Sequence, residues 1–203
     1  MYYPTLSDYI QKAKEEAATL TADRKAVLAP LIRYIQEHKA NGQFIFICTH
    51  NSRRSHFGQI WAHVAALEFG LDGIKTFSGG TEATAFHPNA IAAVERAGII
   101  AESDYSSSIP LVNLSFGSDL PSIKVFSKRY DDEHNPNKDF AAVMTCSEAD
   151  ADCPIVFGAT ARIPLHYVDP KVSDGTEAQE STYDERCRQI ASEMMYTFDQ
   201  ATS

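Results

Sequence analysis

The chain has 203 residues, of which 44% are hydrophobic and 22% are charged, which is an ordinary globular composition. This length predicts one domain, or one domain with an appendage, and a sizeable core. The net charge of −9 argues against nucleic acid or an anionic membrane as partner. The longest apolar run, Phe44 to Cys48, is too short to span a bilayer, and no secretory signal is visible. We therefore expect a cytoplasmic protein whose four cysteines are reactive, metal-binding or inert rather than a disulfide framework.

Residues 1–42 are expected to form a helical extension that precedes the main domain, residues 43–203. Apolar residues recur at helical spacing through 6–19, and Thr21 can cap a second helix. Pro30 should kink or break that helix, and Asn41-Gly42 should end the extension as a turn or C-cap. We expect the extension to serve in packing or in oligomer contacts rather than in chemistry.

From residue 43 onward, short β-like runs alternate with helical patterns, which is typical of a parallel sheet covered on both faces. We expect strands at 44–47, 74–77, 123–127, 140–145 and 163–168, and helices at 55–69, 88–97 and 179–199. Residues 105–122 should be irregular, and 128–138 should form a polar loop. The predicted fold is an α/β fold, an open doubly wound parallel sheet of four or five strands with helices on both faces. Its functional site should lie at the carboxyl ends of the strands.

A cysteine stands at such a strand end. Cys48 follows the run 44–47, and Arg54-Ser55 come six positions later, where a helix begins. Backbone N–H groups of a loop between a strand and a helix bind oxyanions and favour a thiolate, so Cys48 should be nucleophilic. Arg54 can hold two oxygens of a tetrahedral anion, and Ser55 can hydrogen-bond the sulfur. The other residues expected to bind the oxyanion are Thr49, His50, Asn51, Ser52 and Arg53. The alternative is a buried structural cysteine beside a surface arginine.

Residues 44–62 resemble the phosphate loop of low-molecular-weight protein tyrosine phosphatases and of the thioredoxin-coupled arsenate reductases that share their fold. The resemblance covers about 43–200, with insertions, and implies no cofactor. Three positions depart from the family pattern. His50 stands where the family usually has Gly, and Arg53 stands where it usually has Cys. Gln59 replaces a Glu that arsenate reductases often use near a bound cation, which leaves potassium dependence open.

A second chemical signal is the pair Cys146 and Cys153, which six small or polar residues separate directly after a predicted strand. The spacing differs from that of typical zinc ligands. A metal site completed by His166, two unrelated free thiols and a redox pair remain open, and the redox pair is favoured because the short loop can bring the sulfurs together.

The arsenate reductases carry a corresponding C-x6-C-P segment, which the phosphatases lack. The resemblance therefore implies a relay of thiolate displacements. Cys48 attacks arsenate, Cys146 then attacks Cys48 and releases arsenite, and Cys153 attacks Cys146. The final Cys146–Cys153 disulfide is presented to thioredoxin.

Asp169-Pro170 follows the last predicted strand, at the same edge of the sheet as Cys48. Asp169 could protonate a leaving oxygen, although Asp-Pro is also an ordinary turn starter. Family members carry an Asp-Pro at this place. Three functions remain open: a thioredoxin-coupled arsenate reductase, a phosphatase acting on phosphotyrosine or a small phosphoester, and a non-enzymatic oxyanion- or redox-sensing module that binds a partner through residues 1–42.

Overall fold

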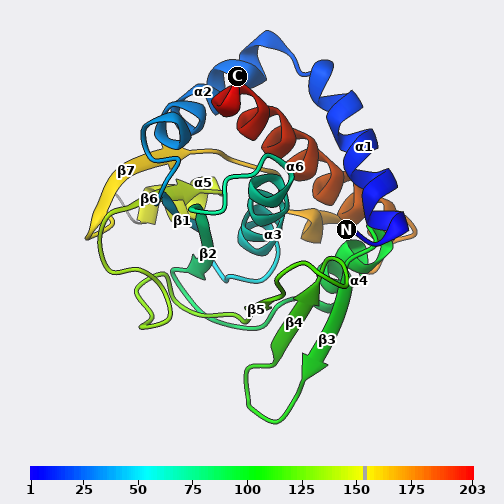
Figure 1. Cartoon of the computed structure of the whole chain (residues 1–203). Helices are drawn as coiled ribbons and strands as arrows, with labels where there is room; N and C mark the ends of the chain where they lie inside the picture. Colours follow the sequence, from blue (N-terminus) through cyan, green and yellow to red (C-terminus); the bar gives the residue numbers. More distant parts are fainter. Residues whose placement is uncertain (153–154) are drawn as a thin grey trace.

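The computed structural model describes residues 1–152 and 155–203. The chain begins with two helices, α1 (Pro4–Ala18) and α2 (Ala22–Glu37), as predicted. Thr21 is the N-cap of α2, because its side chain accepts a hydrogen bond from Arg24 N. Pro30 lies inside α2 without ending it. Both helices pack against α6 (Gln179–Thr202), the long closing helix (Figure 1).

The central sheet is parallel and has four strands in the order β2-β1-β6-β7. These strands are β1 (Gln43–Cys48), β2 (Lys75–Gly80), β6 (Phe140–Met144) and β7 (Ala159–Pro164). The predicted parallel α/β sheet is therefore confirmed. β7 begins earlier in the chain than the predicted 163–168. The prediction missed residues 159–162 because this part of the edge strand alternates exposed and half-buried residues and has no continuous apolar run.

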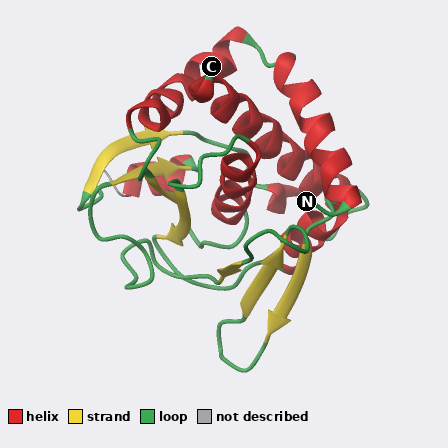
Figure 2. Ribbon diagram, viewed as in Figure 1, coloured by secondary structure: helices red, strands yellow, loops and turns green. Residues whose placement is uncertain are grey.

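Helices cover both faces of this sheet. Phe44 and Phe46 of β1 belong to a large core that also contains residues of α1, α2, α3 (Arg54–Glu68) and α6. Ile45 and Ile47 point to the opposite face, where a smaller cluster includes Cys48 and Ala149 of the short helix α5 (Ser147–Asp152). Figure 2 shows the long helices gathered at one side of the molecule.

A second, antiparallel sheet of order β3-β4-β5 projects from the other end of the molecule (Figure 1). It consists of β3 (Ile100–Asp104), β4 (Leu111–Ser115) and β5 (Ile123–Val125), and it follows helix α4 (Pro88–Arg96). The expectation that 105–122 is irregular holds for 105–110 and 116–122 but was wrong for Leu111–Ser115, which form β4. Val112 and Leu114 alternate there with less buried residues, a short pattern between Ser-rich and Pro-containing stretches. Likewise, 123–125 joins this sheet rather than the parallel one.

A 3-10 turn, η1 (Pro170–Ser173), connects the end of β7 to the segment before α6. Within the described part of the chain, no helix combines the length and the hydrophobicity that crossing a membrane requires.

Candidate active site

The candidate site is built on the loop 49–53, which joins the central strand β1 to the N-terminus of α3. β1 places the Cys48 side chain at its carboxyl end, where the residue is only 4% exposed. Gly80, at the end of β2, lies against this loop. A Cβ atom at Gly80 would stand 2.7 Å from both Thr49 O and Asn51 N, so only glycine allows the close approach.

The backbone of the loop is oriented by hydrogen bonds that its carbonyl groups accept from other segments. These bonds include Thr81 N to Cys48 O, Glu82 N to Thr49 O, Ser127 Oγ to His50 O and His87 N to Ser52 O. In contrast, the N–H groups of residues 49–54 donate to no acceptor in the described residues. Backbone N–H groups left available in this way form a site for an oxyanion.

Asn51 fixes the loop through both ends of its side-chain amide. Its φ of 45° is left-handed, a conformation that asparagine tolerates better than most residues. Asn51 Oδ1 accepts from Lys128 N at 2.9 Å, so Nδ2 must be the group that donates to Ser55 Oγ at 2.8 Å. The Ser55 hydroxyl proton is then free to point at Cys48 Sγ, 3.0 Å away. The sulfur can therefore be the acceptor of this hydrogen bond.

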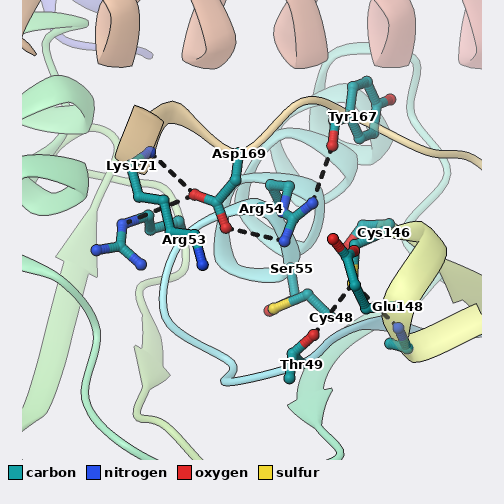
Figure 3. A network of polar contacts seen from close by, with 12 residues as sticks. Cys48, Thr49, Arg53, Arg54, Ser55, Cys146, Glu148, Tyr167, Asp169 and Lys171 are labelled. Atoms are coloured by element: carbon teal, nitrogen blue, oxygen red, sulfur yellow. Dashed lines mark hydrogen bonds and ion pairs between the residues drawn. The ribbon is translucent and has the colours of Figure 1, made fainter. Parts of the chain in front are cut away.

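Arg54 lies over the loop, held by the segment that follows β7 (Figure 3). Its Nη1 donates to Tyr167 O at 3.0 Å, and its Nη2 donates to Asp169 Oδ2 at 2.8 Å. Arg54 Nε is buried and has no partner among residues 1–152 and 155–203. Nε and Nη2 form one edge of the guanidinium, so this edge can meet two oxygens of an anion once Asp169 moves aside.

The Arg54–Asp169 ion pair closes the hollow beside Cys48. The cavity has a volume of about 10 Å³, enough for about one water molecule. Its lining comprises predicted site residues only: Cys48, His50, Ser52, Arg53, Arg54 and Asp169. A tetrahedral oxyanion therefore requires the ion pair to open.

Arg53 is bound at the rim of the hollow rather than inside the loop. Its Nε donates to Tyr183 Oη at 2.7 Å, and its Nη2 contacts Asp174 Oδ2 at 3.2 Å. Nε is also 3.9 Å from Asp169 Oδ1. The His50 side chain is likewise peripheral, half-exposed and 3.7 Å from Glu82 Oε2. Oxyanion binding by these two side chains remains a prediction.

Cys146 follows β6 directly and is fully buried. Its Sγ lies 3.5 Å from Thr49 Oγ1 of the loop and accepts a hydrogen bond from Ala149 N at 3.4 Å (Figure 3). Burial raises the pKa of the Cys146 thiol, and the hydrogen bonds with Thr49 and Ala149 and the charge of Arg54 offset part of this effect. The structure thus brings Cys146 to the loop that carries Cys48, whereas the predicted partner Cys153 lies outside the described residues.

The sequence makes His166 a candidate metal ligand, and Gln59 stands where arsenate reductases often have a Glu near a bound cation. Both side chains make hydrogen-bond contacts within the protein. His166 Nε2 is 3.0 Å from Asp150 Oδ2, and Gln59 Nε2 donates to Thr76 O at 3.1 Å. Among the residues that the structure describes, no group of three or more His, Cys, Asp or Glu side chains is placed to hold a metal ion.

Comparisons with known proteins concern the fold. No protein-family model matches the chain, and no curated protein matches its sequence. A low-molecular-weight phosphotyrosine phosphatase from Vibrio cholerae O395 superposes with a TM-score of 0.52 at 14% identity, covering 78% of this chain and 95% of that one. A YwlE mutant from Bacillus subtilis gives 0.51 at 13% identity, covering 80% and 100%. A YwlE arginine phosphatase mutant with a phosphorylated active-site serine gives 0.51 at 13%, covering 78% and 94%. The chain therefore has the fold of these phosphatases, as the resemblance predicted.

Proposed function

We propose that this chain is a thiol-dependent arsenate reductase in which Cys48 is the nucleophile and Cys146 and Cys153 pass the oxidation to a thioredoxin-like reductant. The observation that carries the proposal is the position of Cys146, buried against the loop with its Sγ 3.5 Å from Thr49 Oγ1. Cys146 and Cys48 belong to the same buried cluster. Hydrolysis of a phosphoester has no use for a second thiol at this place.

The first step is the capture of arsenate by the loop. The anion takes the place of Asp169 at the Nε–Nη2 edge of Arg54, and the free N–H groups of residues 49–54 bind its oxygens. Cys48 then attacks arsenic, and an oxygen leaves as water after Asp169 has protonated it. The product is a covalent Cys48–arsenic(V) adduct.

The second step reduces the arsenic. Cys146 attacks Cys48 Sγ, and the electron pair of the sulfur–arsenic bond goes to arsenic, which leaves as arsenite. Cys153 then attacks Cys146 in the Cys48–Cys146 disulfide and releases Cys48 as a thiolate. Two electrons from the external dithiol reduce the resulting Cys146–Cys153 disulfide. Burial raises the pKa of Cys146, which lowers the fraction of thiolate available for its attack on Cys48 at neutral pH.

The second candidate function is phosphoester hydrolysis. Cys48, Arg54 and Asp169 line one hollow. They can act as the nucleophile, the anion-binding group and the general acid that this reaction requires. The structures that share the fold include a phosphotyrosine phosphatase and an arginine phosphatase. In this mode Cys48 forms a phosphoenzyme that water hydrolyses, and neither Cys146 nor Cys153 takes part.

Single cysteine variants separate these functions. We expect arsenate turnover, coupled to thioredoxin, thioredoxin reductase and NADPH, to be lost in Cys48→Ser, Cys146→Ser and Cys153→Ser. Cys187→Ser is the matched control, because Cys187 is buried beside Trp61 and its new hydroxyl can still accept from Trp61 Nε1. It should keep full activity.

Three results would contradict the proposal. Hydrolysis of p-nitrophenyl phosphate without any arsenate turnover, lost only in Cys48→Ser, would favour the phosphatase. Absence of both activities in the unmodified protein would favour a binding module. Mass spectrometry of the arsenate-oxidised protein should find a Cys146–Cys153 disulfide, and oxidation that spares both residues would exclude the relay.

A further inference from the structure

A buried carboxylate on α6 connects the N-terminal helices to the candidate site. Glu193 is 0% exposed, and four hydrogen bonds satisfy its two oxygens. Oε1 accepts from Arg24 Nε at 2.7 Å and from Gln189 Nε2 at 2.9 Å. Oε2 accepts from Arg24 Nη2 at 2.7 Å and from Tyr167 Oη at 2.7 Å. A buried charge lowers stability unless it is paired in this way. Movement of any partner away from Glu193 would leave the carboxylate unpaired, so these contacts fix the positions of the partners.

Arg24 also contacts the backbone of the segment that contains Tyr167. Its Nη1 donates to His166 O at 3.4 Å, and its guanidinium lies 4.9 Å from the centre of the Tyr167 ring. Burial, followed by the Glu193 carboxylate, raises the pKa of Tyr167 well above its usual value. The Tyr167 hydroxyl therefore stays protonated and remains a donor to Glu193.

The opposite side of the same segment holds the anion-binding guanidinium. Tyr167 O accepts from Arg54 Nη1, which leaves the Nε–Nη2 edge of Arg54 facing Asp169 (Figure 3). Arg54 has a long side chain, and its direction depends on where this carbonyl stands. Hence Arg24 and Glu193 lie on one side of Tyr167, and Arg54 lies on the other.

We propose that Arg24 and Glu193 are positioning residues for the oxyanion site, because through Tyr167 they fix the direction of the Arg54 guanidinium. This inference rests on the proposed role of the loop and Arg54 in oxyanion binding. It gives the N-terminal extension a part in the chemistry, since Arg24 belongs to α2. Neither residue touches the anion; they act by holding the carbonyl that anchors Arg54.

The test measures oxyanion affinity without requiring turnover. The full chain is treated with iodoacetamide, alkylation of the Cys48 peptide is followed by mass spectrometry, and phosphate or arsenate is titrated as protectant. Arg24→Met should raise the Kd of both anions about tenfold, as expected when an anchored group is displaced. The alkylation rate without anion should change less than about twofold, because the sulfur and its partner Ser55 are untouched.

Two further variants separate positioning from folding. Lys25→Met removes the same charge from the next residue of α2, where the ammonium contacts the Tyr196 ring, and should leave both Kd values unchanged. Arg24→Met combined with Glu193→Met removes the whole ion pair, and apolar replacement of such pairs is often neutral for stability. Because Glu193→Met also leaves the buried Tyr167 hydroxyl without its acceptor, we expect this double variant to unfold at a lower temperature. It should stay folded under the assay conditions and still bind both anions about tenfold more weakly.

A folded double variant with unchanged phosphate and arsenate Kd values would overturn the inference and leave the proposed function intact. An equal loss of affinity in Lys25→Met would also overturn it, because charge alone would then explain the effect. If neither anion protects Cys48 in the unmodified protein, the proposed function fails, and the inference fails with it.

Discussion

Replacement of Asp169 by asparagine should change binding and turnover in opposite directions. The Asp169 carboxylate occupies the edge of Arg54 that an oxyanion needs, with Oδ2 2.8 Å from Arg54 Nη2. Asp169→Asn removes the negative charge but keeps an oxygen that can accept from Lys171 N, as Asp169 Oδ1 does at 3.0 Å. The turn at η1 should therefore survive the substitution.

The contacts set the size of the effect. The side chains of Asp169 and Arg54 are only 13% and 9% exposed, so water screens their attraction weakly. Hydrogen bonds to charged groups contribute about 1.5–3 kcal/mol, and the neutral amide retains part of this. If about 1.4 kcal/mol no longer opposes anion entry, the Kd of phosphate falls about tenfold. Loss of the general acid should lower arsenate turnover about 100-fold or more.

The assay combines phosphate protection of Cys48 against iodoacetamide with steady-state arsenate turnover. Asp174→Asn is the matched control, because it makes the same charge change at the rim, where Asp174 pairs with Arg53. It should leave phosphate affinity within about twofold, because it frees no edge of Arg54. Weaker or unchanged phosphate binding in Asp169→Asn, or an equal gain in Asp174→Asn, would refute the reasoning.

Three other outcomes are expected. Asn51→Ala should lower the free energy of unfolding by about 1–3 kcal/mol, measured in urea, because it removes both amide hydrogen bonds at a left-handed residue; an unchanged midpoint would contradict this. Since burial raises the pKa of Cys146, arsenate turnover at saturating reductant should rise with pH from about 7 to 9, and a flat profile would exclude Cys146 as the slow nucleophile. Burial lowers the pKa of His56 to about 3. Between about pH 6.5 and 3, His56 is therefore protonated in the unfolded chain and neutral in the folded chain. Stability should therefore fall as the pH falls through that window, by about 2–3 kcal/mol at about pH 4.5, and His56→Phe should reduce the loss.

The central sheet could be predicted from sequence because its two inner strands, β1 and β6, are buried on both faces. Residues 44–47 of β1 are all apolar for that reason, and the run ends at Cys48 where the loop begins. The second sheet was harder to predict, since β3 alternates exposed and half-buried residues and β5 has three residues. Strands this short and exposed leave little periodicity to detect.

The candidate site divides in the same way. Cys48, Arg54 and Asp169 could be proposed from the sequence because a thiol, a guanidinium and a carboxyl group each have a known role in reactions of oxyanions. The contribution of Tyr167 to Arg54 is a backbone carbonyl, which any residue could supply. Glu193 and Arg24 are 169 positions apart, and no spacing in the sequence connects them. Such contacts exist only once α2, α6 and the segment after β7 have packed together.

The outward bonding of the loop carbonyls bears on when the site can exist during folding. The donors to residues 48–52 come from 81–87 and from Ser127, which are distant along the chain. A fragment of β1, the loop and α3 alone would contain the sequence motif without these donors. Nothing would then orient the backbone N–H groups of the loop toward a common anion site. Anion capture should therefore appear late in folding and vanish in the same cooperative transition as the tertiary structure.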